Sequence, residues 1–343
     1  MRPVDASVLV VGAGAIGGVI AARIAGSVRR VVVLDANDAH VTAMREQGLE
    51  LEVLGAHHRV QLEAYSEPDH LKGPFDLALL TVKALHLRAA VTAIHERRLV
   101  QHYVCLGNGL VHDLAHQLVG ADRLLAGTVE WGATNLGPGR VAQTTIAPTV
   151  IGELDGSCQD RTRLVAQALG AVGEVQLTCN IAGQIWSKLM VNSTFSGLGA
   201  VAGLLYRDVV ANPLGRELAY GLWTEGYDVG CAAGVKMPDV LGVPVKALAV
   251  RDAETRGPGD AALAVLMRTA GAVKASMLQD IERGNSTEID FINGAVVAKG
   301  AEYGVPTPLN AGVVELIHAA ENGTYSPNPA GFASLRHLVR RAG

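Results

Sequence analysis

The feature that most constrains this chain is a glycine-rich stretch near its amino end. The apolar run VLVV (residues 8–11) is followed at once by GAGAIG (residues 12–17). A short apolar run predicts a buried strand, and the segment that follows the glycines, to about residue 25, predicts a helix. Gly12 permits the tight turn, Gly14 lets a ligand approach the backbone, and Gly17 lets the helix pack closely on the strand. The stretch therefore predicts a strand–loop–helix unit that binds an anion at the helix N-terminus.

Asp35 extends this pattern, because it ends a second predicted strand (residues 30–34) and lies 23 residues after Gly12. An acidic residue in this place accepts hydrogen bonds from a ribose, so the combination indicates a dinucleotide site. A carboxylate also repels a 2′-phosphate, and the sequence has no Lys or Arg between Asp35 and Met44. We therefore expect NAD(H) rather than NADP(H). The alternative is that Asp35 only caps the following helix or turn.

The rest of the first half alternates apolar runs with helical segments. Further strands are expected at residues 75–82 and 102–106, and further helices at residues 38–47, 85–96 and 110–119. Residues 126–153 lack helical periodicity and predict more strands, with a turn at residues 137–139. This alternation predicts an α/β fold with a doubly wound, Rossmann-type parallel sheet over residues 1–179.

The second half, residues 180–343, predicts an all-helical domain. Long helical patterns replace the strands, and the expected helices cover residues 183–202, 213–233, 238–251, 259–283, 287–303 and 311–321. The length of 343 residues is itself typical of about two domains. We expect this second domain to carry the substrate site and a dimer surface.

Composition excludes several classes of function. Hydrophobic residues make up 49% of the chain and charged residues 18%, so the chain is not intrinsically disordered. The 29 basic residues are outnumbered by 33 acidic residues, which argues against nucleic acid or anionic membrane as a partner. Four scattered cysteines predict buried free thiols. We therefore expect a cytoplasmic protein that acts on small molecules.

Two polar residues follow predicted strands. Lys83 comes after LLTV (residues 79–82), and Asn108 comes after VCLG (residues 104–107). Ligands bind at the carboxyl ends of strands in open parallel sheets. The residues expected to contact the cofactor are therefore Gly12, Gly14, Ala15, Ile16, Gly17, Asp35, Lys83 and Asn108.

In the helical domain, Lys188, Asn192 and Ser196 are spaced four residues apart. On a regular helix this spacing forms one polar line, and the apolar neighbours leave little of the helix for solvent. A polar line is usually a solvated face, but here it is also consistent with the wall of a cleft. Farther along, SMLQDI (residues 276–281) is followed by a Gly-Asn break and TEIDFING (residues 287–294).

With these segments the sequence closely resembles the ketopantoate reductase family (2-dehydropantoate 2-reductases). The resemblance rests on the glycine loop, Lys83, the Asn108-Gly109 pair, residues 186–192 and residues 276–294. It implies a Rossmann domain joined to a helical domain, an active site between them, and reduction of a 2-oxo acid to a 2-hydroxy acid with a nicotinamide cofactor.

The resemblance also implies roles for individual residues. Lys188 would protonate the carbonyl oxygen during hydride transfer, and Glu288 would bind substrate and hold the lysine. Lys83 and Asn108 would lie near the nicotinamide, whereas Asn192, Ser196 and Ser276 would bind substrate. An ammonium group near a ketone both stabilises the developing negative charge and supplies the proton.

The chain departs from the family pattern in its polar pocket residues. Ser196, Tyr206 and Val273 stand where asparagines are common. Asp35 stands where many members, which use NADP(H), carry a basic residue, so the resemblance leaves NADP(H) as the alternative cofactor. The exchanges predict a less polar substrate pocket, so the expected substrate is ketopantoate or a branched or aromatic relative, with an apolar side chain favoured. The alternative is that the hydroxyls of Ser196 or Tyr206 replace the missing amides and preserve ketopantoate specificity.

Other functions stay open at this point. One is an NAD-dependent dehydrogenase that oxidises a D-2-hydroxy acid, and another is a dinucleotide sensor without catalysis, against which Lys188 and Glu288 argue. A metal hydrolase is disfavoured, because His112 and His116 lack a third ligand, and we expect no metal site. We expect a homodimer.

Overall fold

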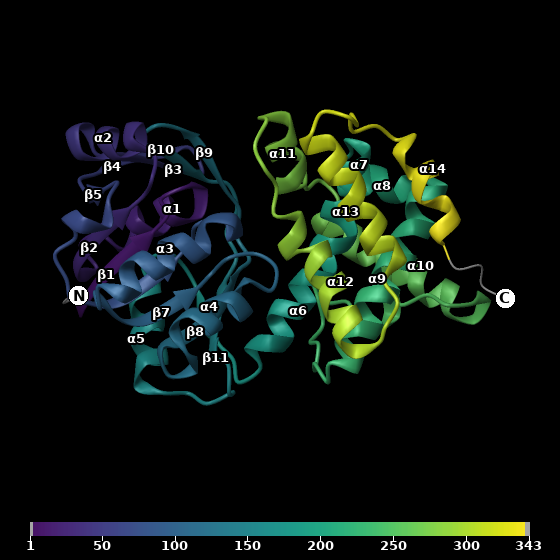
Figure 1. Ribbon diagram of the computed structural model, residues 1–343, viewed down its shortest axis with the longest axis horizontal. Coiled ribbons are helices and arrows are strands. Elements are labelled where there is room, and N and C mark those ends of the chain that lie inside the picture. The colour runs from purple at the N-terminus through teal and green to yellow at the C-terminus, as the bar shows by residue number, and fades with distance from the viewer. Residues whose placement is uncertain (1–2, 340–343) are drawn as a thin grey trace. The chain divides into compact units, whose positions relative to one another are not determined.

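The computed structural model describes residues 3–339, which form two compact units that divide after Ile181. The sequence predicted this division after residue 179, two residues earlier. The first unit contains the strands and the second is helical, and most of the elements are labelled in Figure 1.

The first unit is built on a large, mostly parallel sheet. Its strands are β1 (Val4–Val11), β2 (Val28–Leu34), β5 (Glu63–Tyr65), β6 (Phe75–Leu80), β7 (Val100–Cys105), β8 (Leu124–Val129), β11 (Thr149–Glu153) and β12 (Val175–Leu177). Their order within the described residues is β12-β11-β8-β7-β6-β1-β2-β5, with β8 and β11 antiparallel. The chain builds β2 on one side of β1 and then crosses over to build β6 and β7 on the other. The edge between β1 and β6 is therefore a switch point, where open sheets of this type bind ligands.

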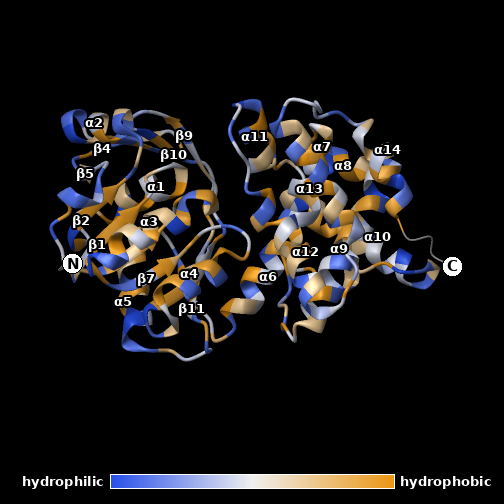
Figure 2. Ribbon diagram, viewed as in Figure 1, coloured by the Kyte–Doolittle hydropathy of each residue, from blue (hydrophilic) through white to orange (hydrophobic). Residues whose placement is uncertain are grey.

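Helices cover both faces of this sheet. The helices α1 (Ala15–Ile24), α2 (Asp38–Gln47) and α5 (Asp160–Leu169) share one apolar core with alternate residues of β1. The helices α3 (Ala84–Glu96) and α4 (Val111–Val119) pack against each other on the opposite face. Burial on both faces explains why the central strands are unbroken apolar runs, as the colouring of β1 in Figure 2 shows. The predicted doubly wound α/β fold is confirmed.

A second, smaller sheet lies in the same unit. It contains β3 (Leu49–Val53), β4 (Ala56–Val60), β9 (Ala133–Gly137) and β10 (Arg140–Gln143), in the order β4-β3-β10-β9. The predicted turn at residues 137–139 joins β9 to β10. Helix α1 packs directly on β10, since a Cβ added to Gly18 would lie 2.8 Å from Val141 Cγ1. The sequence predicted strands within residues 126–153, where β9 and β10 lie, but it predicted neither β3 and β4 nor a separate sheet.

The second unit is helical. After α6 (Ile181–Val191) the chain forms a π-helical turn, Asn192–Ser196. The helices that follow are α7 (Gly197–Ala202), α8 (Tyr206–Ala211), α9 (Pro213–Ala232), α10 (Ala253–Ala270), α11 (Ser276–Glu282), α12 (Asn293–Tyr303), α13 (Pro308–Glu321) and α14 (Gly331–Leu335). Helix α13 packs against α7, α9 and α12 (Figure 1).

Three predicted helices differ from the structure. Residues 238–251 hold only a 3₁₀ turn (Val245–Leu248), because Leu241 and Gly242 have left-handed φ angles of 50° and 78°. The helix predicted over residues 259–283 is two helices, α10 and α11. The helix predicted over residues 287–303 begins only at Asn293, after a 3₁₀ turn at Ile289–Phe291.

Two further observations complete the fold. Of the cysteines, Cys105 is buried, but Cys158, Cys179 and Cys231 are exposed, so the prediction of burial was wrong for these three. They lie in loops or at the exposed end of α9. Among residues 3–339, no helix has both the length and the apolar character needed to cross a membrane.

Candidate active site

The glycine loop after β1 is fixed by close contacts that explain two of its glycines. Gly12 has a φ of +88°, and a Cβ added there would lie 2.7 Å from Val82 Cγ1. A Cβ added to Gly17 would overlap the carbonyl oxygen of Gly12. The same oxygen accepts a 2.7 Å hydrogen bond from the hydroxyl of Thr81, which the sequence did not single out. A side chain at Gly12 or Gly17 would therefore disrupt the conformation of the loop.

Gly14 has the opposite environment. It is the N-cap residue of α1, and a Cβ added there would meet no protein atom within 4 Å. Space beside the backbone at a helix N-terminus suits an anion, because the amides and the helix dipole stabilise its charge. With Gly14, the first helical residues Ala15, Ile16 and Gly17 present this N-terminus. The loop fits the pyrophosphate of a dinucleotide.

Asp35 follows β2 and bonds to the loop itself. Its Oδ2 atom accepts a 2.6 Å hydrogen bond from the Ala13 amide, and Oδ1 accepts a 2.9 Å bond from the Asn37 amide. A carboxylate has about four acceptor positions, so capacity for ribose hydroxyls remains. The N-cap of α2 is Asn37, whose side chain accepts from the His40 amide. Asp35 thus braces the loop and the next turn and does not cap the helix.

Lys83 and Asn108 follow neighbouring strands. Leu80 of β6 is paired with Cys105 of β7, so both residues come at the same edge of the sheet as the glycine loop. Lys83 is the N-cap residue of α3, and Asn108 lies between β7 and α4, before Gly109 with its φ of +72°. Both side chains are half-buried. The unit therefore gathers the predicted cofactor residues along one edge.

In the helical unit, Lys188 lies in the last turn of α6 and Asn192 begins the π-helical turn. Both are half-buried. In a π turn each carbonyl bonds five residues ahead rather than four, and such turns are frequent at functional sites. The chain is therefore irregular directly beside the predicted proton donor.

Ser196 does not continue the predicted polar line. The π turn changes the number of residues per turn, so a spacing of four no longer returns to the same face. Ser196 is only 3% exposed, and its hydroxyl lies 2.5 Å from the hydroxyl of Tyr206, which is 4% exposed. Burial raises the pKa of Tyr206, an effect that the hydrogen bond with Ser196 opposes. One hydroxyl therefore donates to the other inside the helical unit.

A buried amide holds the π turn. Asn293 Nδ2 donates to the Ser193 carbonyl at 2.8 Å and to Asn310 Oδ1 at 3.0 Å. Asn310 donates in turn to Glu225, at 2.8 Å, and Glu225 also accepts from the Leu309 amide at the start of α13. Asn293 lies within the TEIDFING segment, but no local pattern there indicates a bond to a residue one hundred positions earlier.

Glu288 and Ser276 occupy different environments. Glu288 is 9% exposed and precedes the 3₁₀ turn Ile289–Phe291. Its neighbour Thr287 donates its amide to Glu321 Oε1 at 2.6 Å, which ties this segment to α13. Ser276 is the first residue of α11 and is exposed. Asn293 connects the Glu288 segment to the turn that follows Lys188.

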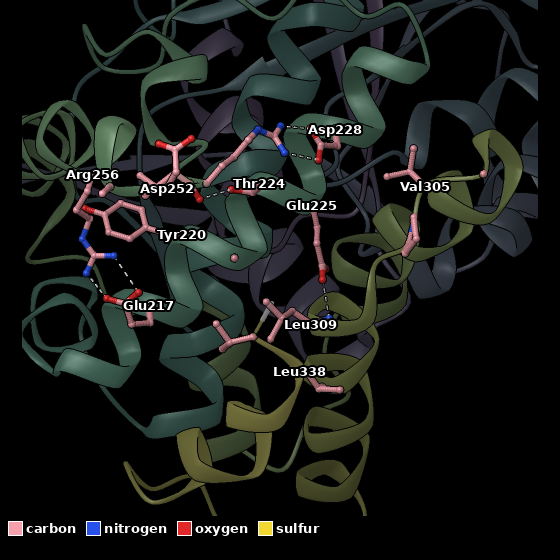
Figure 3. A pocket seen from close by; sticks show the side chains of 17 residues that line it. Glu217, Tyr220, Thr224, Glu225, Asp228, Asp252, Arg256, Val305, Leu309 and Leu338 are labelled. Carbon is pink, nitrogen blue, oxygen red and sulfur yellow. Dashed lines mark hydrogen bonds and ion pairs between the residues drawn. The ribbon is translucent and has the colours of Figure 1, made fainter. Parts of the chain in front are cut away.

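The helical unit also contains a pocket of about 860 Å³, shown in Figure 3. None of the predicted site residues lines it. Its charged walls are ion pairs, Arg256 with Glu217 and Arg251 with Asp228. Among the described residues, the lining also includes the carboxylates of Glu225 and Asp252 and no basic residue besides the two arginines, so it carries an excess of negative charge, which disfavours the anion of a 2-oxo acid.

The structure also bears on the disfavoured metal site. Among the described residues 3–339, no three His, Cys, Asp or Glu side chains are grouped as metal ligands. The Nε2 atom of His112 lies 3.5 Å from Oδ1 of the adjacent residue, Asp113.

Comparisons with known families agree with the geometry. Residues 8–156 match the family described as ketopantoate reductase PanE/ApbA, and residues 180–321 match its C-terminal counterpart. The chain is 30% identical to the 2-dehydropantoate 2-reductase of Mesorhizobium japonicum, over 93% of this chain and 99% of that one. It is 29% identical to the 2-dehydropantoate 2-reductase of Archaeoglobus fulgidus, over 92% and 98% of the two chains.

Solved structures give the same result. A D-mandelate dehydrogenase in a ternary complex with NADH and anilino(oxo)acetate matches with a TM-score of 0.80 and 25% identity, over 92% of this chain and 99% of that one. A PanE/ApbA family ketopantoate reductase from Ralstonia eutropha matches with a TM-score of 0.79 and 26% identity, over the same shares. The glycine loop, the two-unit fold and these matches together show that the chain belongs to the ketopantoate reductase family and is an NAD(P)-dependent oxidoreductase.

Proposed function

We propose that this protein uses NADH to reduce a 2-oxo acid with an apolar side chain to the 2-hydroxy acid. The observation that carries the proposal is the buried pair of Ser196 and Tyr206, whose hydroxyls lie 2.5 Å apart. Both side chains are buried, at 3% and 4% exposed, and one hydroxyl donates to the other, so we expect neither to bind a polar arm of the substrate. Val273, the third position where the family commonly has an amide, is an apolar side chain that is 44% exposed. These positions favour a branched or aromatic substrate over ketopantoate.

The proposed chemistry assigns one role to each residue. When bound, the nicotinamide supplies the hydride. Lys188 donates the proton to the carbonyl oxygen, where negative charge develops, and its ammonium group stabilises that charge. Glu288 positions Lys188, while Asn192 and Ser276 bind the substrate carboxylate. Lys83 and Asn108 orient the nicotinamide end of the cofactor.

The preference for NADH rests on Asp35. Its carboxylate is anchored by the Ala13 and Asn37 amides and retains acceptor capacity for the two ribose hydroxyls. A 2′-phosphate in the same place would meet a fixed negative charge.

The similar D-mandelate dehydrogenase supports both parts of the proposal, because its complex contains NADH and an oxoacetate that carries an aromatic group. The named 2-dehydropantoate 2-reductases favour ketopantoate as the alternative substrate. D-2-hydroxy acid oxidation is the same reaction in reverse. The homodimer and the cytoplasmic location stay predictions.

A spectrophotometric screen tests the proposal. Purified protein is mixed with a panel of 2-oxo acids, with NADH and NADPH in parallel, and loss of reduced nicotinamide is followed by absorbance. The panel includes pyruvate, 2-oxoisovalerate, phenylglyoxylate and ketopantoate. We expect turnover with NADH and the branched or aromatic acids. Activity confined to ketopantoate with NADPH would contradict the proposal.

A further inference from the structure

The imidazole of His40, in the first turn of α2, connects the glycine loop to the second sheet. The side chain is 2% exposed. Its Nε2 atom lies 2.8 Å from the carbonyl oxygen of Ala13, and its Nδ1 atom lies 2.8 Å from the amide nitrogen of Gly139. Gly139 follows the turn between β9 and β10 and is 99 residues away in the chain. One buried ring thus contacts two backbones that are distant in sequence.

The two contacts determine where the ring proton lies. A backbone amide only donates, so Nδ1 must accept from Gly139. The proton is therefore on Nε2, which donates to the Ala13 carbonyl. His40 acts in this arrangement as a neutral ring with one acceptor and one donor.

The Gly139 side of this bridge is rigid. Gly139 has a φ of +70°, and a Cβ added there would lie 2.8 Å from the Cβ of Ala43, one turn after His40 on α2. The carbonyl of Gly139 accepts a 2.8 Å hydrogen bond from the Glu50 amide in β3. The small sheet therefore holds the ring at a fixed angle.

On the other side, both polar groups of Ala13 are occupied. Its amide donates to Asp35 at 2.6 Å, and its carbonyl accepts from His40 at 2.8 Å. A trans peptide is planar, so the Ala13 carbonyl and the Gly14 amide point in opposite directions. The bond from His40 consequently sets the direction of the Gly14 amide, at the place where the loop is open and α1 begins.

We propose that His40 is a positioning residue for the dinucleotide. Its Nε2–H group holds the Ala13–Gly14 peptide so that the Gly14 amide faces the pyrophosphate, and the β9–β10 turn holds the ring. The second sheet thereby contributes to cofactor affinity without touching the cofactor. The inference rests on dinucleotide binding and not on the identity of the 2-oxo acid.

Two substitutions separate this role from simple packing. Gln places its amide nitrogen where Nε2 lies, so His40→Gln keeps a donor for Ala13. Asn places its amide oxygen where Nδ1 lies, so His40→Asn keeps an acceptor for Gly139 and loses the Ala13 bond. The matched control is Ser7→Ala, which removes the buried 2.8 Å hydrogen bond from Ser7 to Asp76, away from the loop, in the same large sheet.

The measurement is the dissociation constant of NADH and of NADPH by nicotinamide fluorescence, with thermal unfolding recorded for every variant. We expect His40→Asn to weaken the preferred cofactor about tenfold, the size of one hydrogen bond. His40→Gln and Ser7→Ala should stay within about threefold of the wild type. Equal affinities of the Gln and Asn variants would overturn the proposal.

Other outcomes are also decisive. Loss of folding in both His40 variants would make the residue structural and contradict the positioning role. A wild-type protein that binds neither cofactor would contradict this proposal together with the proposed function. Absence of 2-oxo acid turnover with normal cofactor binding would contradict the proposed function alone.

Discussion

The hydroxyl groups of Ser196 and Tyr206 lie 2.5 Å apart in the interior of the helical unit, where one donates a hydrogen bond to the other. Tyr206 begins α8, and its ring also packs 5.7 Å from that of Phe195 in the π turn. The pair therefore joins α8 to the turn that follows Lys188. The pair stands where the family resemblance implies asparagines, and the proposed substrate preference rests on this exchange.

The first prediction concerns this pair. Ser196→Ala leaves the Tyr206 hydroxyl buried without its partner, and we expect a loss of about 1–3 kcal/mol in the free energy of unfolding. The double variant Ser196→Ala/Tyr206→Phe should lose less than the sum of the single variants, because it removes both polar groups. Urea unfolding measures all three. Additive losses would show that the two hydroxyls do not interact.

The second prediction concerns the proton donor. Lys188→Ala should lower kcat by about 10²–10⁴, because general-acid catalysis acts mainly in the transition state. NADH affinity should be unchanged. The control is Lys274→Ala, which removes an exposed lysine of the same unit, paired with Glu282. Near-normal turnover in the Lys188 variant would remove this residue from the mechanism.

The third prediction concerns cofactor choice. Asp35→Ala removes the charge and the acceptor for the Ala13 amide, whereas Asp35→Asn keeps an acceptor and removes only the charge. We expect the two variants to reduce the ratio of NADH affinity to NADPH affinity by about tenfold. Only Asp35→Ala should also lower the affinity for NADH and for NADPH. Asp38→Ala, at an exposed acidic residue in the first turn of α2, is the control. Tighter binding of NADPH than NADH by the wild type would refute the role of Asp35.

The fourth prediction concerns pH. His318 lies 2.8 Å from Glu321 and 2.9 Å from Asp290. The hydrogen bond to Glu321 raises the pKa of His318 against a smaller effect of burial. Burial raises the pKa of Glu321, but bonds from Thr287 and His318 outweigh it and leave the pKa lowered.

The sign of the effect follows from these directions. Because the pKa of His318 is raised in the folded state, its contribution to the stability of the fold is fully present below the unfolded pKa of about 6.5. This contribution is lost as pH rises through the folded pKa. Because the pKa of Glu321 is lowered in the folded state, its contribution to the stability of the fold is fully present above the unfolded pKa of about 4.5. This contribution is lost as pH falls through the folded pKa. The Tm difference between wild type and His318→Gln should therefore be greatest between these values and shrink toward pH 9. His86→Gln, on the exposed side of α3, is the control. A difference that grows with pH would contradict the assignment.

Local patterns in the sequence predicted the parts of the fold that depend on neighbouring residues. The glycine loop is one, because Gly12, Gly14 and Gly17 are required by a turn, an open space and a helix contact within a few residues. The strand ends at Lys83 and Asn108 are another. The mispredicted helix at residues 238–251 shows the limit, since two left-handed residues override its apolar spacing.

Contacts between distant residues were not predictable in this way. The π turn forms where Asn293 takes up the carbonyl of Ser193, and it moves Ser196 off the expected line. His40 bonds Gly139 across 99 residues. The sequence near His40 or Asn293 has no pattern that identifies the bonding partner, because the packing of sheets and helices determines which distant residue lies beside each side chain.

The most direct test of the central claim compares kcat/KM for 2-oxoisovalerate and ketopantoate with NADH. The two acids differ by a hydroxymethyl group, whose hydroxyl the asparagines implied by the family resemblance would bind. An apolar pocket discriminates by only about 1–3 kcal/mol per methylene, so we expect 2-oxoisovalerate to equal or exceed ketopantoate. A site that hydrogen-bonds the hydroxyl would favour ketopantoate by about 10⁴ or more. An advantage of that size for ketopantoate would contradict the account.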